Sequence, residues 1–213
     1  MLSLSCATSL SLMSSTRPIP DKETMAMLPE FPRLGLPQIT LVTTETQAVE
    51  ACARLREHAA LGFDTESKPT FHRDQVSEGP HIIQLATLSH AWVFQLHDAG
   101  CSHQIAQLLG EPKRILAGFG LGDDNKRIVA KLGVVPVGAL ELNSLFRERG
   151  YRKDMGVKAA VAVLFSQRFI KSKKAATSNW ANHRLSESQL IYAANDAYAA
   201  ACVFKALNDS RPA

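Results

Sequence analysis

The stretch LGFDTE at residues 61–66 predicts a β-strand that leaves the core and ends in acid. Phe63 is apolar, and Asp64 and Glu66 follow it two positions apart. Side chains two residues apart on a strand point to the same face, about 6.6 Å apart along the chain, so Thr65 points away from both acids. Two carboxylates on one face can bind a hard cation. A solvated strand end that leads into a turn is the alternative explanation.

Two apolar runs follow this strand. HIIQLAT at 81–87 and AWVFQL at 91–96 flank the turn-like residues 88–90, and this pattern predicts an antiparallel hairpin. Together with LGFDTE, the hairpin makes a predicted meander of three strands. Further strands are predicted at 39–42, at 114–120 (RILAGFG, which runs into a Gly-rich turn) and at 140–142.

Helical segments separate the remaining strands. Two of them begin with a capping box, in which Thr44 or Ser186 is followed three residues later by Gln. The predicted helices run from Thr44 to about His58, over 103–109, up to about Leu132, over 155–169 and from Ser186 to about Leu207. This order predicts an α/β fold with a mixed central sheet of about five strands and helices on both faces. An RNase H-like sheet is one such arrangement.

A doubly wound nucleotide-binding fold is another arrangement that the element order allows, and GFGLGD at 118–123 tests it. The stretch follows a strand and opens a helix, as the dinucleotide-binding pattern GxGxxG does. The third glycine of that pattern falls on Asp123, and an acid beside a pyrophosphate is electrostatically unfavourable. The dinucleotide-binding interpretation therefore fails.

The composition is that of an ordinary globular protein. The 213 residues are 46% hydrophobic and 21% charged, with 24 basic and 20 acidic residues and a formal net charge of +4. No window holds the run of about 18 apolar residues that a membrane-spanning helix needs, so no membrane partner is predicted. The four scattered cysteines make no ligand cluster, which argues against a zinc site and predicts a cytoplasmic, reducing environment.

The N-terminal part of the chain differs from the rest. Residues 1–22 begin as a Ser/Thr/Leu-rich segment and are predicted to form a flexible leader, with a secretory signal as the alternative. Prolines punctuate residues 23–38, which are predicted to be an extended arm. The domain itself is predicted at 39–208, and 209–213 form a tail.

Two further places in the sequence carry acids, and one of them also carries a tyrosine. Asp123 and Asp124 lie in the first turn of a helix, where acids cap the helix and interact favourably with its dipole. Tyr192 and Asp196 lie four residues apart on one helix and therefore on one face. Each feature alone has a structural explanation, but their combination with the FDTE strand is hard to attribute to chance.

Three stretches resemble the motifs of the DEDD exonucleases. FDTESKPTF, GFGLGDDNKRI and TSNWANHRLSESQLIYAANDAYAA are similar to the first, second and third motifs of that family. The resemblance is to the tyrosine subgroup, which contains ribonuclease D, the proofreading domain of bacterial DNA polymerase I and the Werner syndrome exonuclease domain. It covers roughly residues 39–208, and its third motif is the most specific.

The resemblance implies a set of site residues. It implies four metal-binding acids and a tyrosine that orients the attacking water: Asp64, Glu66, Asp124, Asp196 and Tyr192. Asp124 rather than Asp123 fits the family spacing Gly-x-Gly-hydrophobic-x-x-Asp counted from Gly118. The histidine subgroup would place a histidine at position 191, where this sequence has Ile191.

The implied function is that of a metal-dependent 3′-5′ exonuclease that acts on DNA or RNA and releases nucleoside 5′-monophosphates. Two cations about 4 Å apart can activate water and stabilise the leaving oxygen, and ligands that are all oxygen suit Mg²⁺ or Mn²⁺. A phenol with an unperturbed pKa near 10 is a poor base, so Tyr192 is predicted to position a water. A catalytically silent nucleic-acid-binding module on the same fold is the alternative, and a pure interaction domain is a third possibility.

Basic residues concentrate in one segment. Between Arg147 and Arg184, ten Lys or Arg residues accompany two acids, which gives a local charge of 10 − 2 = +8. Such a run is usually a solvated face, but next to a carboxylate site it is a candidate phosphate track. The predicted nucleic-acid contacts are Lys171, Lys173, Lys174 and Trp180, with Trp180 favoured as a core residue.

Overall fold

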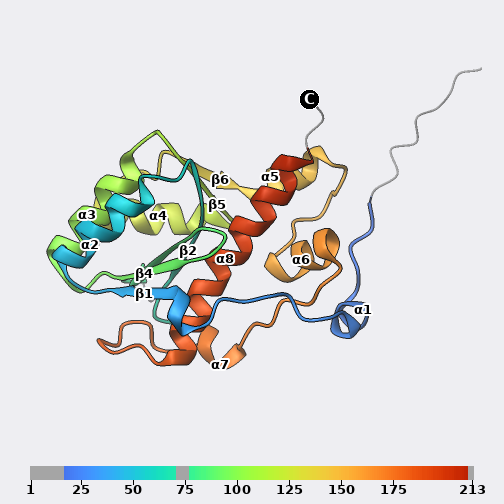
Figure 1. The fold of residues 1–213 in the computed structure, drawn as a ribbon, viewed down its shortest axis with the longest axis horizontal. Coiled ribbons are helices and arrows are strands. Elements are labelled where there is room, and N and C mark those ends of the chain that lie inside the picture. The colour runs from blue at the N-terminus through green and yellow to red at the C-terminus, as the bar shows by residue number, and fades with distance from the viewer. Residues whose placement is uncertain (1–16, 71–76, 211–213) are drawn as a thin grey trace, which may run out of the picture.

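The computed structural model describes residues 17–70 and 77–210. Within these ranges, six strands form one mixed sheet in the order β1-β4-β3-β2-β5-β6 (Figure 1). The strands are β1 (Ile39–Val42), β2 (Ala60–Glu66), β3 (Ile82–Ala86), β4 (Ala91–Gln95), β5 (Ile115–Gly118) and β6 (Ala139–Glu141).

The pairing confirms the predicted meander. β2 pairs antiparallel with β3, and β3 pairs antiparallel with β4. The remaining pairs, β1 with β4, β2 with β5 and β5 with β6, are parallel. The sheet has six strands where about five were predicted, and the mixed α/β class is confirmed.

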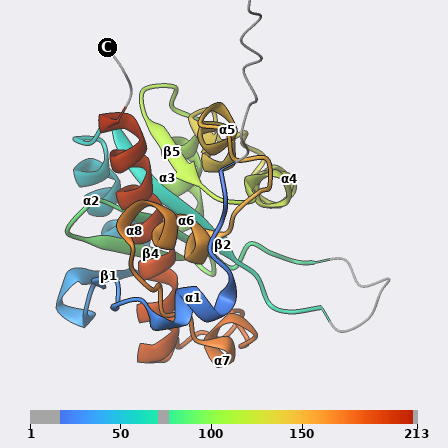
Figure 2. The same cartoon turned by 90° about the vertical axis from the view of Figure 1, so that its right-hand side faces the viewer.

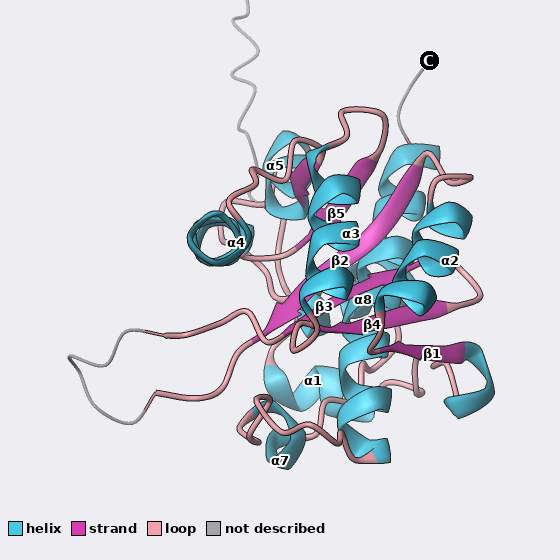
Figure 3. Cartoon of the chain, turned by 90° about the vertical axis from the view of Figure 1, so that its left-hand side faces the viewer, coloured by secondary structure: helices cyan, strands magenta, loops and turns pink. Residues whose placement is uncertain are grey.

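Helices cover both faces of the sheet (Figures 1 and 3). They are α1 (Lys22–Met27), α2 (Glu45–Leu55), α3 (Ala99–Gly110), α4 (Leu121–Leu132), α5 (Leu142–Glu148), α6 (Val157–Phe165), α7 (Lys173–Ala176) and α8 (Glu187–Asp209). Helices α2, α3 and α4 bury apolar side chains against one face, and α5 to α8 cover the other. No helix within the described ranges has the length and apolar character needed to cross a membrane.

Five helical segments differ from the prediction. Helices α1, α5 and α7 were not predicted from the sequence, and α3 begins at Ala99 because Asp98 caps it through the amide of Cys101 at 2.7 Å. The helix predicted over 155–169 ends at Phe165, since Ser166 takes a left-handed conformation with φ 52°. The chain beyond it turns toward the N-terminal arm.

Helix α8 lies unusually close to β2 because small residues meet there. A Cβ added at Gly62 would lie 1.8 Å from the carbonyl oxygen of Ala197 and 2.6 Å from the amide of Ala201, so only glycine permits this approach. Gly62, Asp64 and Glu66 share one face of β2 by strand alternation. The close contact therefore brings α8 over the face from which the two acids project.

The arm that precedes β1 is packed against the α6 and α8 side of the molecule, and Figure 2 shows it in blue running past α5 and α6 to α1. The Phe31 ring lies 5.3 Å from that of Phe165 and 6.0 Å from that of Tyr198, measured between centroids. Beyond it, the Leu34 amide donates to Asn195 Oδ1 at 2.8 Å. The parts of the predicted leader and tail at 1–16 and 211–213 lie outside the described residues.

Candidate active site

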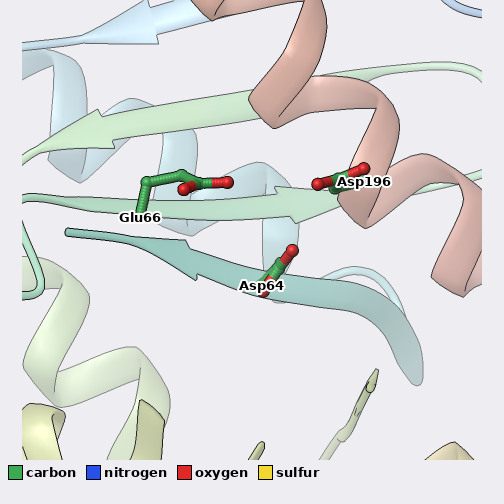
Figure 4. Close-up of side chains that lie close together, drawn as sticks. All are labelled: Asp64, Glu66 and Asp196. Carbon is green, nitrogen blue, oxygen red and sulfur yellow. The ribbon is translucent and has the colours of Figure 1, made fainter. Parts of the chain in front are cut away.

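Three carboxylates converge at the end of β2. Asp64 and Glu66 project from the strand, and Asp196 projects toward them from α8 (Figure 4). One carboxylate oxygen from each residue lies within 4.8 Å of the other two. Strand alternation places Asp64 and Glu66 on one face, and the close approach of α8 at Gly62 brings Asp196 to the same face.

The environment of these acids opposes their ionisation. Burial, reinforced by the Asp196 and Asp124 carboxylates, raises the pKa of Asp64 well above its usual range. Burial and the Asp64 charge raise the pKa of Glu66 to about 9. Burial also raises the pKa of Asp196, against the opposing charge of Lys171. Without a further cation, Glu66 therefore retains its proton at neutral pH.

This donor set fits a hard divalent cation. The three residues offer only oxygen atoms, which Mg²⁺ and Mn²⁺ prefer. Both oxygens of Asp196 are buried, and its side chain is 3% exposed. A cation there would offset the repulsion among the carboxylates, which Lys171 compensates only in part.

Asp124 reaches the same end of β2 from the α4 side. Its Oδ1 accepts a hydrogen bond of 2.7 Å from Thr65 Oγ1, while Arg127 Nη1 lies 4.0 Å away. Thr65 points away from Asp64 and Glu66, as predicted, and its hydroxyl therefore reaches Asp124 on the other side of the strand. Asp123 is exposed and pairs with Lys126 at 3.0 Å, so the geometry favours Asp124 over its neighbour.

Tyr192 and Lys171 form the other side of the site. Tyr192 is buried one turn before Asp196 on α8. Lys171 Nζ lies 2.6 Å from Asp196 Oδ2 and 5.0 Å from the centroid of the Tyr192 ring. Burial acts to lower the pKa of Lys171, but the Asp196 carboxylate outweighs it and the pKa is raised, so the amine is charged. Lys171 therefore lies inside the carboxylate site.

These side chains line a cavity of about 340 Å³. Its apolar wall consists of Phe63, Phe119 and Val157. The three converging acids and Lys171 line the same cavity, whereas Asp124 does not, so one space offers an oxygen-rich surface, a cation and aromatic rings. This combination suits a ligand with an anionic group and a flat apolar part.

The remaining predicted nucleic-acid contacts divide into two kinds. Lys173 and Lys174 are exposed on α7 and remain accessible to a ligand. Trp180 has none of its surface exposed and packs near Tyr192, with ring centroids 5.9 Å apart. The prediction of Trp180 as a nucleic-acid contact is therefore wrong, because a fully buried indole offers no face to a base. Its interpretation as a core residue is the correct one.

Several basic side chains between Arg147 and Arg184 already have partners within the protein. Arg168 pairs with Glu30 at 2.9 Å, and Arg147 pairs with Asp154. Arg149 donates to the carbonyl oxygen of Leu207. Several of the ten basic side chains thus stabilise the domain.

The sequence interpretation missed one polar residue beside the site. Gln84 is fully buried in β3 and lies opposite Asp64 in the strand register. Within the described residues, neither atom of its side-chain amide has a hydrogen-bond partner. The signal was present in the sequence, since IIQLA holds one polar residue in an otherwise apolar strand.

The sequence profile of the 3′-5′ exonuclease family matches residues 39–210, which is most of the chain. The chain belongs to this family.

Two relatives agree with this assignment. The chain is 26% identical over 153 residues to a 3′-5′ exonuclease of Arabidopsis thaliana, covering 71% of this chain and 53% of that protein. It is 27% identical over 158 residues to the bifunctional 3′-5′ exonuclease/ATP-dependent helicase WRN of Mus musculus, covering 73% of this chain and 11% of that protein. The chain thus matches about half of the first relative and about a tenth of the second.

Solved structures confirm the RNase H-like fold. The Nibbler EXO domain of Aedes aegypti superposes with a TM-score of 0.70 at 19% identity, covering 84% of this chain and 90% of that one. Escherichia coli RNase D gives a TM-score of 0.67 at 20% identity, covering 81% of this chain and 46% of that one. RNase D of Trypanosoma brucei, solved in complex with RNA U12, gives a TM-score of 0.70 at 18% identity, covering 87% of this chain and 64% of that one.

Proposed function

We propose that the protein removes nucleotides from the 3′ ends of DNA or RNA with two divalent cations, Mg²⁺ or Mn²⁺, and releases nucleoside 5′-monophosphates. The convergence of Asp64, Glu66 and Asp196 within 4.8 Å is the observation that carries this proposal. These three residues would hold cations from the α8 side, and Asp124 would contribute from the α4 side. When bound, the cations would activate water and neutralise charge in the transition state.

The reaction is a hydrolysis in which the atoms balance without another reactant. The oxygen of a water molecule forms a bond to the phosphorus of the terminal nucleotide, and the bond between phosphorus and the preceding 3′ oxygen breaks. That 3′ oxygen gains a proton and remains on the shortened strand. The water oxygen leaves as part of the nucleoside 5′-monophosphate.

Tyr192 is proposed to position the water. Burial and the charge of Asp196 raise the pKa of Tyr192 above its usual value, so the phenol remains neutral at physiological pH. A neutral phenol can donate one hydrogen bond and accept others, but it is a poor proton acceptor in the chemical step. Its role would therefore be orientation of the water.

Lys173 and Lys174 are proposed to contact the phosphates of the strand beyond the site, and Lys171 to face the substrate inside it. The first two are exposed on α7, two and three residues after a lysine that lines the cavity. Their contribution would be electrostatic and therefore dependent on salt. Neutralising both should weaken binding and reduce its salt dependence, which a filter-binding titration at several salt concentrations would measure.

The test of function uses strands labelled at the 5′ end, as single-stranded DNA, recessed DNA and single-stranded RNA, with Mg²⁺, Mn²⁺ or EDTA. The expected result is stepwise shortening from the 3′ end, a monophosphate product and no cleavage in EDTA. The Asp64→Asn/Asp196→Asn double variant should be inactive while retaining the fold by circular dichroism. Undiminished cleavage in EDTA or by this double variant would refute the metal mechanism.

The alternative is a catalytically silent nucleic-acid-binding module. The four acids and Tyr192 are all present, and three of the acids converge, which weighs against a site that has lost its chemistry. Binding of labelled strands without shortening under any of the metal conditions would favour the silent module.

We also propose a cytoplasmic, reducing location. Cys52, Cys101 and Cys202 are free thiols, and the first two are buried. Thiols persist where the environment is reducing. Fractionation of cells with an antibody to the protein would test this location.

A further inference from the structure

Lys171 forms an ion pair with one of the three carboxylates that would hold a cation. Its Nζ lies 2.6 Å from Asp196 Oδ2, and the Lys171 side chain is 30% exposed whereas that of Asp196 is 3% exposed. A divalent ion of the Mg²⁺ type binds carboxylate oxygen at about 2.0–2.1 Å. An ammonium and such an ion on the same oxygen would be two unscreened positive charges within a few ångströms of each other.

The backbone around this ion pair is fixed by the N-terminal arm. Arg168, three residues before Lys171, donates its amide to the Pro29 carbonyl at 2.7 Å and accepts from the Phe31 amide at 2.9 Å. Asn195, next to Asp196, accepts from the Leu34 amide at 2.8 Å and donates to the Leu34 carbonyl at 3.1 Å. The arm thus joins the two segments that carry the ion pair.

This anchoring restrains the backbone near Lys171, so we expect the lysine side chain to be the part that moves. The Lys171 backbone is held close to Asp196 through Arg168, whereas its side chain has a flexible four-carbon stem that ends at the cavity. A rotamer change can move the ammonium off the carboxylate without disturbing the fold. The cavity that it lines provides room for that movement.

We propose that Lys171 is an internal competitor for the metal: it neutralises Asp196 in the metal-free protein, and a divalent cation must displace its side chain to bind there. The proposal rests on the metal-dependent function proposed above. The displaced ammonium remains tethered at the cavity wall, where it can contact an anionic substrate. One side chain thereby alternates between the carboxylate and the substrate side of the cavity.

The test is a calorimetric titration of the full chain with Mn²⁺. Lys171→Met removes the charge and keeps the length of the side chain, and Lys174→Met makes the same charge change at an exposed position three residues away. Relief from the competitor should make Lys171→Met bind Mn²⁺ about tenfold more tightly, the equivalent of roughly 1.4 kcal/mol. Lys174→Met should bind as the wild type does.

Acetylation of the wild-type protein, quantified by mass spectrometry, detects displacement without any variant. Saturating Mn²⁺ should expose Lys171 and increase its acetylation severalfold, while Lys173 and Lys174 react equally with and without the metal. This measurement remains decisive if Lys171→Met fails to fold.

The outcomes separate the two proposals. Equal Mn²⁺ affinity in both variants, or a Lys171 that stays protected in saturating Mn²⁺, overturns displacement even if the wild type shortens nucleic acid with Mn²⁺. Tighter binding by Lys171→Met with a protected Lys171 in the wild type also overturns it, because the lysine then acts on the metal from an unchanged position. Absence of Mn²⁺ binding in every form refutes the metal site itself and the proposed function with it.

Discussion

Helices α8 and α4 each bring an acid to the end of β2, but they do so by different physical means. α8 rests directly on the strand at Gly62, where backbone atoms of Ala197 and Ala201 leave no room for a Cβ, and Asp196 is adjacent to this contact. The α4 helix begins at Leu121, directly after Gly120, whose φ of 70° is left-handed and which has no side chain to cap the helix. Its acid, Asp124, is held through one hydrogen bond from Thr65.

The difference shows which parts of the site are rigid. Asp196 is positioned by backbone packing along a helix of 23 residues that starts with a complete capping box at Ser186. Asp124 is positioned by a side-chain contact and is closer to solvent. A change under α8 should therefore affect both stability and activity, whereas a change at α4 should affect activity alone.

The largest effect is expected from Gly62→Ala. The new Cβ overlaps the Ala197 carbonyl oxygen, so α8 must move, which should cost about 3 kcal/mol of the free energy of unfolding and abolish nuclease activity. Gly122→Ala on α4 is the matched control, because its Cβ would meet nothing within 4 Å and alanine favours a helix. Urea denaturation and an activity assay measure both. A stable, active Gly62→Ala protein would show that the contact does not fix Asp196.

Asp124→Asn should reduce activity more than about a hundredfold. Loss of a residue that only hydrogen-bonds to a metal ligand typically lowers activity about 10- to 100-fold, and loss of a ligand itself should lower it further. Its melting temperature should change little, because Asp124 accepts one hydrogen bond from Thr65 and its ion pair with Arg127 is long, at 4.0 Å. The neighbouring Asp123→Asn is the control, as that carboxylate is exposed and pairs only with Lys126 in the salt bridges described. Rate measurements at saturating Mn²⁺ distinguish the two. An equal loss of activity in both variants would contradict the assignment of Asp124 as a metal ligand.

Thr65→Val tests the hydrogen bond that holds Asp124. Valine keeps the shape of the side chain but removes the donor, so activity should fall about tenfold, as is typical for partners of metal ligands. Thr65→Ser keeps the hydroxyl and should retain most of the activity. The two variants are compared over a range of Mn²⁺ concentrations. Normal activity in Thr65→Val would indicate that Asp124 needs no such support.

The last expected effect concerns stability rather than activity: measured without metal, the melting temperature should depend on pH. Glu66 has its pKa raised from 4.5 to about 9, so between these values the folded protein holds a proton that the unfolded chain has released. The free energy of unfolding should therefore fall as pH rises through this window. Glu66→Gln should flatten the slope. A melting temperature that rises steadily from pH 5 to 9 would contradict the environment described for the cluster.

Much of the fold could be predicted because periodicity in the sequence reflects burial directly. The hairpin of β3 and β4 follows from two apolar runs around a turn, and α8 follows from the capping box at Ser186. The helix over 155–169 was predicted too long, since an apolar run does not reveal that Ser166 adopts a left-handed conformation. Short helices such as α1 depend on one cap and carry little periodic signal.

The site was predictable to the extent that its residues lie within motifs. Asp64 and Glu66 share a face by strand alternation, and Tyr192 and Asp196 share one by helical periodicity. Lys171 and Trp180 show the limit of this reasoning, because both were assigned from a local excess of charge. One lies inside the carboxylate site and the other in the core, positions that depend on how the segment after α6 folds back.

The sequence by itself determined the candidate site residues, because its motifs resemble those of a known family and local spacing on a strand or helix fixes the face on which each side chain lies. Only the tertiary structure decided which of them meet. The approach of α8 at Gly62 brings Asp196 to Asp64, and the bonds from the arm to Arg168 and Asn195 bring Lys171 to Asp196. These contacts join residues far apart along the chain, and their geometry depends on packing that no local pattern encodes.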